Sequence, residues 1–249
     1  MSEEKKWAKV WAKEKSVEEL LSIVEEEAFR IKHILSYMPK GKILEAGCGD
    51  GKYVFYLERL GYDVYGIDFV KEVIERDKGI CKKSGIGNPE RFKVMDVCKL
   101  QFPDDYFDGY ISMGVIEHFQ DPCLPLKEAY RVTKKGGIAF ITVPNKLSLW
   151  YYITKRLYMK FGKGDWLWQK EYTKWELKSF ATSVGFKCIK SFNCNVRDSL
   201  RSAFLSEEKT VAKVPNPFYY FGGLLYWLGR KAENLLSLLG YHSVFVGEK

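Results

Sequence analysis

The chain lacks any uninterrupted run of 18 apolar residues, so no segment of its sequence has the composition of a membrane-spanning helix. Its opening residues, Met-Ser-Glu-Glu-Lys-Lys, lack the apolar core of a secretion signal. The six cysteines form no Cys-x-x-Cys pair, which is the spacing of many zinc and redox sites. These absences favour reduced thiols, and we therefore expect a cytoplasmic protein.

Histidine is also scarce, with only His33, His118 and His242 in the chain. Histidine is the side chain whose ordinary pKa lies closest to neutral pH, so there are few candidates for proton transfer. His33 falls in an amphipathic stretch and His242 precedes a predicted terminal strand, and we interpret both as structural.

The composition is that of a globular protein, because 46% of the 249 residues are hydrophobic and 29% are charged. This length fits one large α/β domain with additions. The net charge is +8, and residues 146–190 hold ten Lys/Arg against three Asp/Glu. Such a basic stretch favours an anionic partner, but a solvated lysine-rich surface explains it equally well.

The stretch from Lys42 to Gly51 reads as a buried strand that breaks into alternating glycines and leads into a helix over 52–60. Glycines at such a turn let a ligand lie against bare backbone, facing the N-terminus of the helix. The Gly-x-Gly-x-x-Gly spacing of a dinucleotide site is absent, because Lys52 stands where its last glycine would be.

The N-terminal region predicts a loose helix within the first 15 residues and a longer amphipathic one after them. Ser16 and Glu19 form a capping box, and apolar residues then recur at helical spacing to Tyr37, before Pro39. This long helix can cover a sheet edge or lie over a ligand pocket, and both alternatives stay open.

The remaining pattern alternates strands and helices, which predicts a sheet with helices on both faces. The predicted strands are 63–68, 91–95, 107–113, 138–143, 186–192 and 243–247. The predicted helices are 70–83, 124–133 and 173–184, and 134–137 is expected to be a turn.

Several motifs in order resemble those of class I S-adenosylmethionine-dependent methyltransferases, particularly the ubiquinone and menaquinone biosynthesis group. They are Glu-x-Gly-x-Gly-x-Gly at 45–51, Asp68 after the second strand, the segment 96–108, and 115–122. The resemblance runs from about Lys42 to Val143. It implies a Rossmann-like, doubly wound sheet of seven strands, mostly parallel with an antiparallel last strand.

The resemblance implies S-adenosylmethionine as the cofactor and a set of residues that contact it. Position alone supports Asp68, since an acidic residue at the end of the second strand can accept hydrogen bonds from both ribose hydroxyls. The family pattern places the three glycines at the methionine and ribose, and Asp96 with Val97 at the adenine. The full predicted set is Glu45, Gly47, Cys48, Gly49, Gly51, Asp68, Phe69, Asp96, Val97 and Met113.

His118 follows the fourth strand, at the edge where open α/β sheets bind ligands, and is the candidate general base. Glu117 beside it is a second catalytic candidate. Alternatively, His118 packs against the following loop, or the pair serves the cofactor pocket. Some family members hold a divalent cation with Glu-x-x-Glu-His; here Gly114 replaces the first glutamate, so we expect no metal.

The predicted acceptor is a small or lipid-like molecule that is methylated at oxygen. Two alternatives stay open: an RNA or protein methyltransferase that docks through its basic insert, and a non-catalytic protein that binds the cofactor. Nucleic acid is disfavoured, because there is no Asn-Pro-Pro-Tyr-type motif. The predicted organisation is a helical extension at 1–40 and a catalytic domain at 41–249, with a substrate-side insert at 146–170 and a helical addition at 196–240. Aromatic and basic residues in 146–170 and 217–239 suit peripheral membrane contact.

Overall fold

The computed structural model describes residues 2–148, 169–194 and 240–249. Residues 196–239 of the predicted helical addition, which include the stretch 217–239, and most of the insert at 146–170 lie outside these described residues. The strands are β1 (Lys42–Ala46), β2 (Asp63–Asp68), β3 (Phe92–Val94), β4 (Phe107–Met113), β5 (Thr133–Pro144), β6 (Lys187–Cys194) and β7 (His242–Glu248). The α-helices are α1 (Glu3–Val10), α2 (Val17–Glu26), α3 (Ala28–Tyr37), α4 (Lys52–Arg59), α5 (Lys71–Ser84), α6 (Cys123–Val132) and α8 (Lys174–Ser183), with 3₁₀ turns η1 (Pro89–Arg91) and η2 (Ile116–His118).

The seven strands form one sheet in the order β3-β2-β1-β4-β5-β7-β6. Neighbours from β3 to β5 run parallel, whereas β7 is antiparallel to both β5 and β6. The predicted sheet, mostly parallel with an antiparallel last strand, is therefore confirmed.

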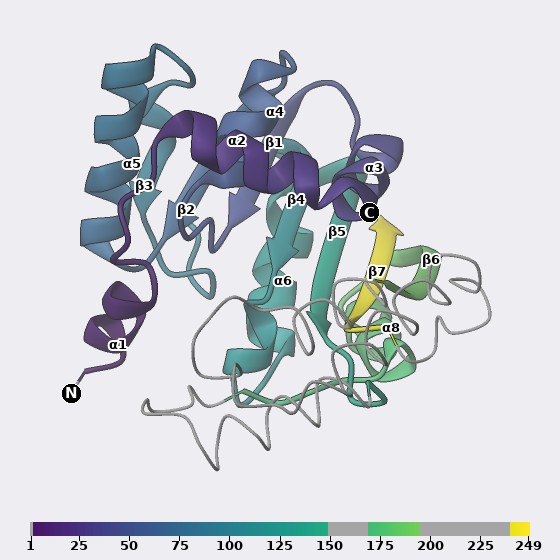
Figure 1. The fold of residues 1–249 in the computed structure, drawn as a ribbon. Coiled ribbons are helices and arrows are strands. Elements are labelled where there is room, and N and C mark those ends of the chain that lie inside the picture. Colours follow the sequence, from purple (N-terminus) through teal and green to yellow (C-terminus); the bar gives the residue numbers. More distant parts are fainter. Residues whose placement is uncertain (1, 149–168, 195–239) are drawn as a thin grey trace, which may run out of the picture.

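Helices cover both faces of this sheet, as Figure 1 shows. Ile43 and Leu44 are adjacent in β1 and fully buried, yet they belong to two different hydrophobic clusters. Successive strand residues point to opposite faces, so each face needs its own cover. Helices α2, α3, α4 and α5 supply the cover that packs on Ile43, and α6 and α8 supply the cover that packs on Leu44.

The strand order reverses direction between β1 and β4. From β1 the chain continues through β2 to β3 on one side, and then returns to pair β4 with the other side of β1. The connections that leave β1 and β4 therefore diverge, which opens a crevice at the carboxyl ends of these strands.

The single helix predicted over residues 16–37 is wrong, because the structure breaks it into α2 and α3 at Glu27. Glu27 has ψ +35°, outside the helical range. Its carboxylate is held by Lys52 at 2.7 Å, by Arg30 at 3.1 Å and by the Tyr53 hydroxyl. Lys52 and Tyr53 belong to α4, so a contact distant in sequence accompanies the break. The capping box of Ser16 and Glu19 is confirmed.

The turn predicted at 134–137 is also wrong, since these residues belong to β5. The Gly136 N–H donates to the carbonyl of Lys249, and the Lys249 N–H donates back to the carbonyl of Gly137. The surplus residues are absorbed as a bulge, because Phe107 pairs with Thr133 and Gly109 pairs with Ile138. A strand from the far end of the chain thus overrides a local turn sequence.

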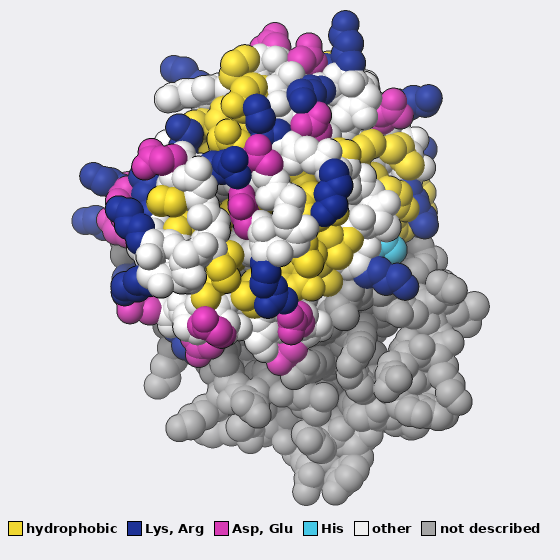
Figure 2. Space-filling model, turned by 90° about the horizontal axis from the view of Figure 1, so that it is seen from above, with side chains coloured by type: hydrophobic (Ala, Val, Ile, Leu, Met, Phe, Trp, Pro, Cys, Tyr) yellow, Lys and Arg dark blue, Asp and Glu magenta, His cyan; other side chains and the backbone are white. Residues whose placement is uncertain are grey.

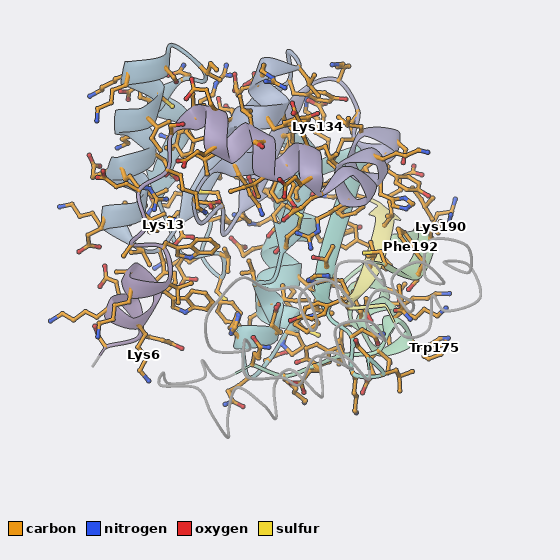
Figure 3. All side chains as sticks on the ribbon, in the orientation of Figure 1. Lys6, Lys13, Lys134, Trp175, Lys190 and Phe192 are labelled. Carbon is orange, nitrogen blue, oxygen red and sulfur yellow. The ribbon has the colours of Figure 1, made fainter. Side chains whose placement is uncertain are left out.

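On the face seen in Figure 2, lysine, arginine and acidic side chains are interspersed among apolar ones. At the β6 edge, Lys190 and Phe192 lie on the same side of the molecule as Trp175 of α8 (Figure 3). Within the described residues, no helix combines the length and the apolar character that crossing a membrane requires.

Candidate functional site

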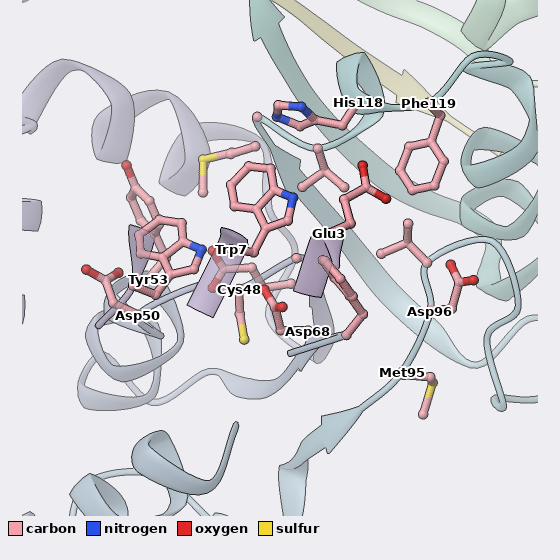
Figure 4. Close-up of a pocket in the computed structure, with 18 of the residues that line it drawn as sticks. Glu3, Trp7, Cys48, Asp50, Tyr53, Asp68, Met95, Asp96, His118 and Phe119 are labelled. Carbon is pink, nitrogen blue, oxygen red and sulfur yellow. The ribbon is translucent and has the colours of Figure 1, made fainter. Parts of the chain in front are cut away.

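A cavity of 720 Å³ lies in the crevice at the carboxyl ends of the central strands (Figure 4). Its volume is in the range of small-molecule sites. It brings together residues that the sequence spreads over more than 70 positions. The predicted residues on its wall are Glu45, Gly47, Cys48, Asp68, Phe69, Asp96, Val97, Met113 and His118.

Three predicted residues lie behind the wall. A Cβ on Gly49 would lie 2.6 Å from the Trp11 ring, so this glycine packs beneath an indole. Gly51 caps α4 with φ +68°, a backbone conformation that favours glycine, and packs beside Asp77. Glu117 is buried in η2 and is not in contact with the cavity.

Asp68 ends β2 with its carboxylate at the cavity, 6% exposed. One oxygen accepts the Gly49 N–H at 3.1 Å and the other accepts the Val70 N–H at 3.0 Å. Burial raises the pKa of this carboxyl, and the two N–H groups oppose that rise. Each oxygen has lone pairs to spare, so the carboxylate is fixed in place and can still accept from a ligand.

Asp96 and Val97 follow β3 and line the same cavity. Asp96 Oδ1 accepts the Cys98 N–H at 2.8 Å, which orients the side chain as in an Asx turn. Val97 is 7% exposed and offers an apolar surface beside it. Phe69, 41% exposed, comes from the loop after β2.

The floor of the cavity is formed by Gly47 and Glu45. A Cβ on Gly47 would overlap Val115 Cγ2, so the loops after β1 and β4 approach closely only because residue 47 is glycine. Glu45 is 3% exposed, and its Oε2 has no hydrogen-bond partner among the described residues. Burial, together with the nearby Asp50, raises the pKa of Glu45 well above its ordinary value.

A polar cluster on the wall was not predicted from the sequence. Arg30 Nη1 lies 2.9 Å from the Tyr53 hydroxyl and 3.1 Å from Glu27 Oε2, and Lys52 Nζ lies 2.7 Å from Glu27 Oε1. Two cations share one carboxylate, and Arg30 Nε has no partner among the described residues. The sequence signal that could have found this cluster is the spacing of Glu27 and Arg30, three positions apart beside the apolar face of a predicted helix.

Two tryptophans of the N-terminal region also line the cavity and were missed as site residues. Trp7 and Trp11 are four positions apart, which puts both rings on one helix face. The Trp7 ring meets the His118 ring edge to face, with centroids 4.8 Å apart and planes at 84°. These contacts place α1 at the cavity. The two alternatives left open concern the helix predicted over 16–37, of which Arg30 in α3 lines the cavity while α2 packs against α4.

Glu117, next to His118, is 1% exposed, and its Oε2 lacks a partner among the described residues. Burial raises its pKa to about 8. The carboxyl is therefore mostly protonated at pH 7 and does not present a negative charge to the imidazole. Of the other histidines, His33 packs on Phe192, and His242 lies 3.5 Å from Arg30 Nη2 with its pKa lowered by burial.

Comparison with known proteins places this site in a family. Residues 44–141 match the family model described as a methyltransferase domain. The chain is 30% identical over 181 residues to the ubiquinone biosynthesis O-methyltransferase of Pelagibacter ubique, covering 69% of this chain and 72% of that one. The chain belongs to the class I S-adenosylmethionine-dependent methyltransferases. It is an enzyme of that family, whose cofactor is S-adenosylmethionine.

One further relative and one solved structure are similar to the methyltransferase over different shares of the chain. It is 33% identical over 98 residues to the phosphatidylethanolamine N-methyltransferase of Cereibacter sphaeroides, covering 39% of this chain and 47% of that one. The match thus spans less than half of this second relative. The crystal structure of a SAM-dependent methyltransferase from Archaeoglobus fulgidus has a TM-score of 0.59 and 20% identity, covering 90% of this chain and 94% of that one. This likeness shows the shared fold.

The cavity of the methyltransferase fits its cofactor on three observations. Glu45 lies on the wall, and its buried Oε2, which has no hydrogen-bond partner among the described residues, can accept from an ammonium group. Gly47 leaves space that any side chain would fill. The Asp68 carboxylate is held by backbone N–H groups and keeps lone pairs for hydroxyl donors.

Proposed function

We propose that this methyltransferase transfers a methyl group to a hydroxyl oxygen of a small or lipid-like acceptor. The observation that carries the proposal is a single cavity whose wall includes Asp68 and Asp96 as well as His118. Around His118 the wall is largely apolar, with Trp7, Val115 and Phe119. Such surroundings suit a ring or an apolar chain that presents one polar group to the imidazole.

The carboxylates of Asp68 and Asp96 are assigned to different parts of the cofactor. Asp68 would accept hydrogen bonds from the two ribose hydroxyls. Asp96 Oδ2, the oxygen that does not accept the Cys98 N–H, would accept a hydrogen bond from the adenine amino group. Phe69 and Val97, which line the cavity beside Asp96, would pack against the adenine. The groups assigned to the methionine and ribose are Glu45, Gly47, Cys48, Gly49, Gly51 and Met113, with Gly49 and Gly51 acting through the shape of the loop.

Arg30 and Lys52 are assigned to the carboxylate of the cofactor's methionine. Both cations already pair with the carboxylate of Glu27, and both lie on the cavity wall, where a second carboxylate can join them. An arginine fork binds a carboxylate with more than one hydrogen bond, and Arg30 Nε has no acceptor among the residues that the structure describes. Tyr53 holds the guanidinium in place.

When bound, S-adenosylmethionine supplies a methyl group that its positive sulfur already activates. The protein has to align the acceptor, exclude water and remove one proton, and alignment alone can supply about 7–11 kcal/mol at its upper end. His118 would take the proton of the acceptor hydroxyl while the methyl carbon exchanges its bond to sulfur for a bond to that oxygen, which would leave S-adenosylhomocysteine and a methylated acceptor. The imidazolium would later return its proton to water. Glu117 is assigned a positioning role behind the imidazole.

A relative that methylates the amine of phosphatidylethanolamine makes an amine-bearing lipid the second candidate acceptor. The RNA and protein alternatives depend on the insert at 146–170, which lies largely outside the described residues. The cytoplasmic location and the peripheral membrane contact through 146–170 and 217–239 stay predictions, and fractionation of cells into soluble and membrane-bound protein tests them.

The first test is calorimetric titration with S-adenosylhomocysteine, the product form of the cofactor. We expect micromolar binding, at least a tenfold loss in Asp68→Ala, and no loss in Asp104→Ala, which removes an exposed carboxylate at an ion pair with Arg131. NAD should not bind. Absence of binding by folded wild-type protein would refute the assignment of the cofactor site.

The acceptor atom is tested by transfer of labelled methyl to a matched pair of compounds, a hydroxylated aromatic ring and the same ring carrying an amine. We expect product from the hydroxyl compound, and its loss in His118→Gln. Transfer to the amine alone would contradict the assignment to oxygen. A steep loss of acceptor affinity with added salt would instead favour a nucleic-acid acceptor.

A further inference from the structure

The N-terminal arm, defined here as residues 3–15, lies on the cavity without contributing to the core. It comprises α1 and the five residues that follow it. None of the residues of α1 is buried. An element that buries so little apolar surface is held by few contacts and opens at low cost in free energy. Its position therefore depends on a small number of identifiable side chains.

At the C-terminal end of the arm, these contacts all reach the glycine loop. Arg76 of α5 donates to the carbonyl of Trp11 and also, at 3.3 Å, to the carbonyl of Gly49. Lys15 Nζ lies 2.5 Å from Asp50 Oδ2, and Asp50 is 5% exposed. The arm is thus fastened to two consecutive residues of the loop.

The indole of Trp11 completes this attachment. It covers Gly49 so closely that a Cβ there would lie 2.6 Å from the ring. The N–H of the same glycine donates to Asp68 at 3.1 Å. A displacement of Trp11 or Arg76 would therefore shift Gly49, and with it the Asp68 carboxylate that is assigned to the ribose.

At its other end the arm reaches the opposite wall of the cavity. The Trp7 ring contacts the His118 ring, and both residues line the cavity. In the view of Figure 4, Trp7 lies between His118 and Asp68. Glu3, one turn earlier in α1, is on the wall as well. The arm spans the cavity from the glycine loop to the loop after β4.

We propose that the N-terminal arm is part of the active site and docks over the bound cofactor, with Trp11 and Arg76 as cofactor-positioning residues and Trp7 as the anchor at His118. This inference rests on the proposed function. A ligand that binds better when the arm is docked must in turn stabilise docking. Cofactor release then requires the arm to lift, so its contacts control the dissociation rate.

The test is stopped-flow measurement of S-adenosylhomocysteine dissociation from the full-length protein. We expect about tenfold faster release in Trp11→Leu and in Trp7→Leu, with little change in the association rate. Trp11→Phe and Trp7→Phe keep an aromatic ring and should restore slow release. The matched control is Trp175→Leu, which removes a 55% exposed tryptophan from α8, at the other side of the molecule from the arm in Figure 3.

Hydrogen–deuterium exchange supplies a readout that does not depend on release rates. S-adenosylhomocysteine should slow exchange of the amides of residues 3–11 in wild-type protein and in Trp175→Leu, but not in Trp11→Leu. Unchanged release from both leucine variants, or no protection of the arm by ligand, would overturn the inference. Failure of wild-type protein to bind the ligand would refute the proposed function instead, so the two failures are distinguishable.

Discussion

Replacing Glu117 with glutamine should change how the stability of the protein depends on pH. The carboxyl of Glu117 is buried against the loop that carries His118, and Oε2 has no hydrogen-bond partner within the described part of the chain. Burial disfavours the charged form, which raises the pKa of Glu117 from its ordinary value of 4.5 to about 8. Glutamine has nearly the same shape and cannot lose a proton in this range.

The sign of the effect follows from the proton balance. Between pH 4.5 and 8 the folded protein keeps the Glu117 proton, whereas the unfolded chain loses it. The unfolded state then binds fewer protons, so the free energy of unfolding falls as pH rises, by about 1.4 kcal/mol per pH unit. From pH 5 to pH 7 this one carboxyl lowers the free energy of unfolding by about 3 kcal/mol.

Urea unfolding of wild-type protein and of Glu117→Gln at pH 5, 6, 7 and 8 measures this contribution. Other buried acids titrate in both proteins, so the difference between the two curves isolates Glu117. We expect wild-type protein to lose stability relative to the variant at each step up to pH 7. Glu90→Gln, which changes an exposed carboxylate, should run parallel to wild type. Parallel curves for wild type and Glu117→Gln would refute the assignment of a protonated, buried carboxyl.

Two further substitutions test the glycine loop from either side. Gly47→Ala forces a side chain onto a backbone with φ +80° and into Val115. We expect urea unfolding to show a loss of about 1–2 kcal/mol in the free energy of unfolding, and S-adenosylhomocysteine to bind more weakly. Adding Val115→Ala to the same chain should relieve the overlap but not the cost of the backbone conformation. Asp77 lies beside Gly51, and burial raises the pKa of its carboxyl to about 7 against the opposing charge of Arg76. The free energy of unfolding of the wild-type protein should therefore fall as pH rises from about 4 to 7, and Asp77→Asn should remove about 2 kcal/mol of that fall between pH 5 and 7. An unchanged slope in urea unfolding would mean that the carboxyl is ionised throughout this range.

The strands around the cofactor side of the cavity were predictable because their signals are local. The predicted fourth strand, 107–113, coincides with β4, and the predicted second strand coincides with β2. In each case a short apolar or alternating run is bounded by polar or glycine residues, and both faces are buried. The sites at the strand ends, such as Asp68, follow from topology once the strands are placed.

The errors share one physical origin, which is contact between residues far apart in the chain. The helix break at Glu27 accompanies contacts with Lys52 and Tyr53, 25 and 26 positions later. The supposed turn at 134–137 becomes strand because Lys249 pairs with it. No periodicity within α2 or within β5 reports such partners, so local patterns suggested a continuous helix and a turn.

The glycine motif specifies the loop that faces the cavity, but not the side chains that surround this loop. The glycines of the motif, Gly47 and Gly51, allow the backbone conformation of the loop, and the strand order places this loop at the crevice between β1 and β4. The residues that hold this loop and complete its cavity come from elsewhere: Arg76 from α5, Arg30 from α3, Trp7 and Trp11 from the arm. None of them belongs to the motif, and Trp7 is the one in contact with His118. The sequence motif therefore identified the cofactor, whereas the acceptor depends on side chains outside the motif, among which Trp7 lies beside the candidate base.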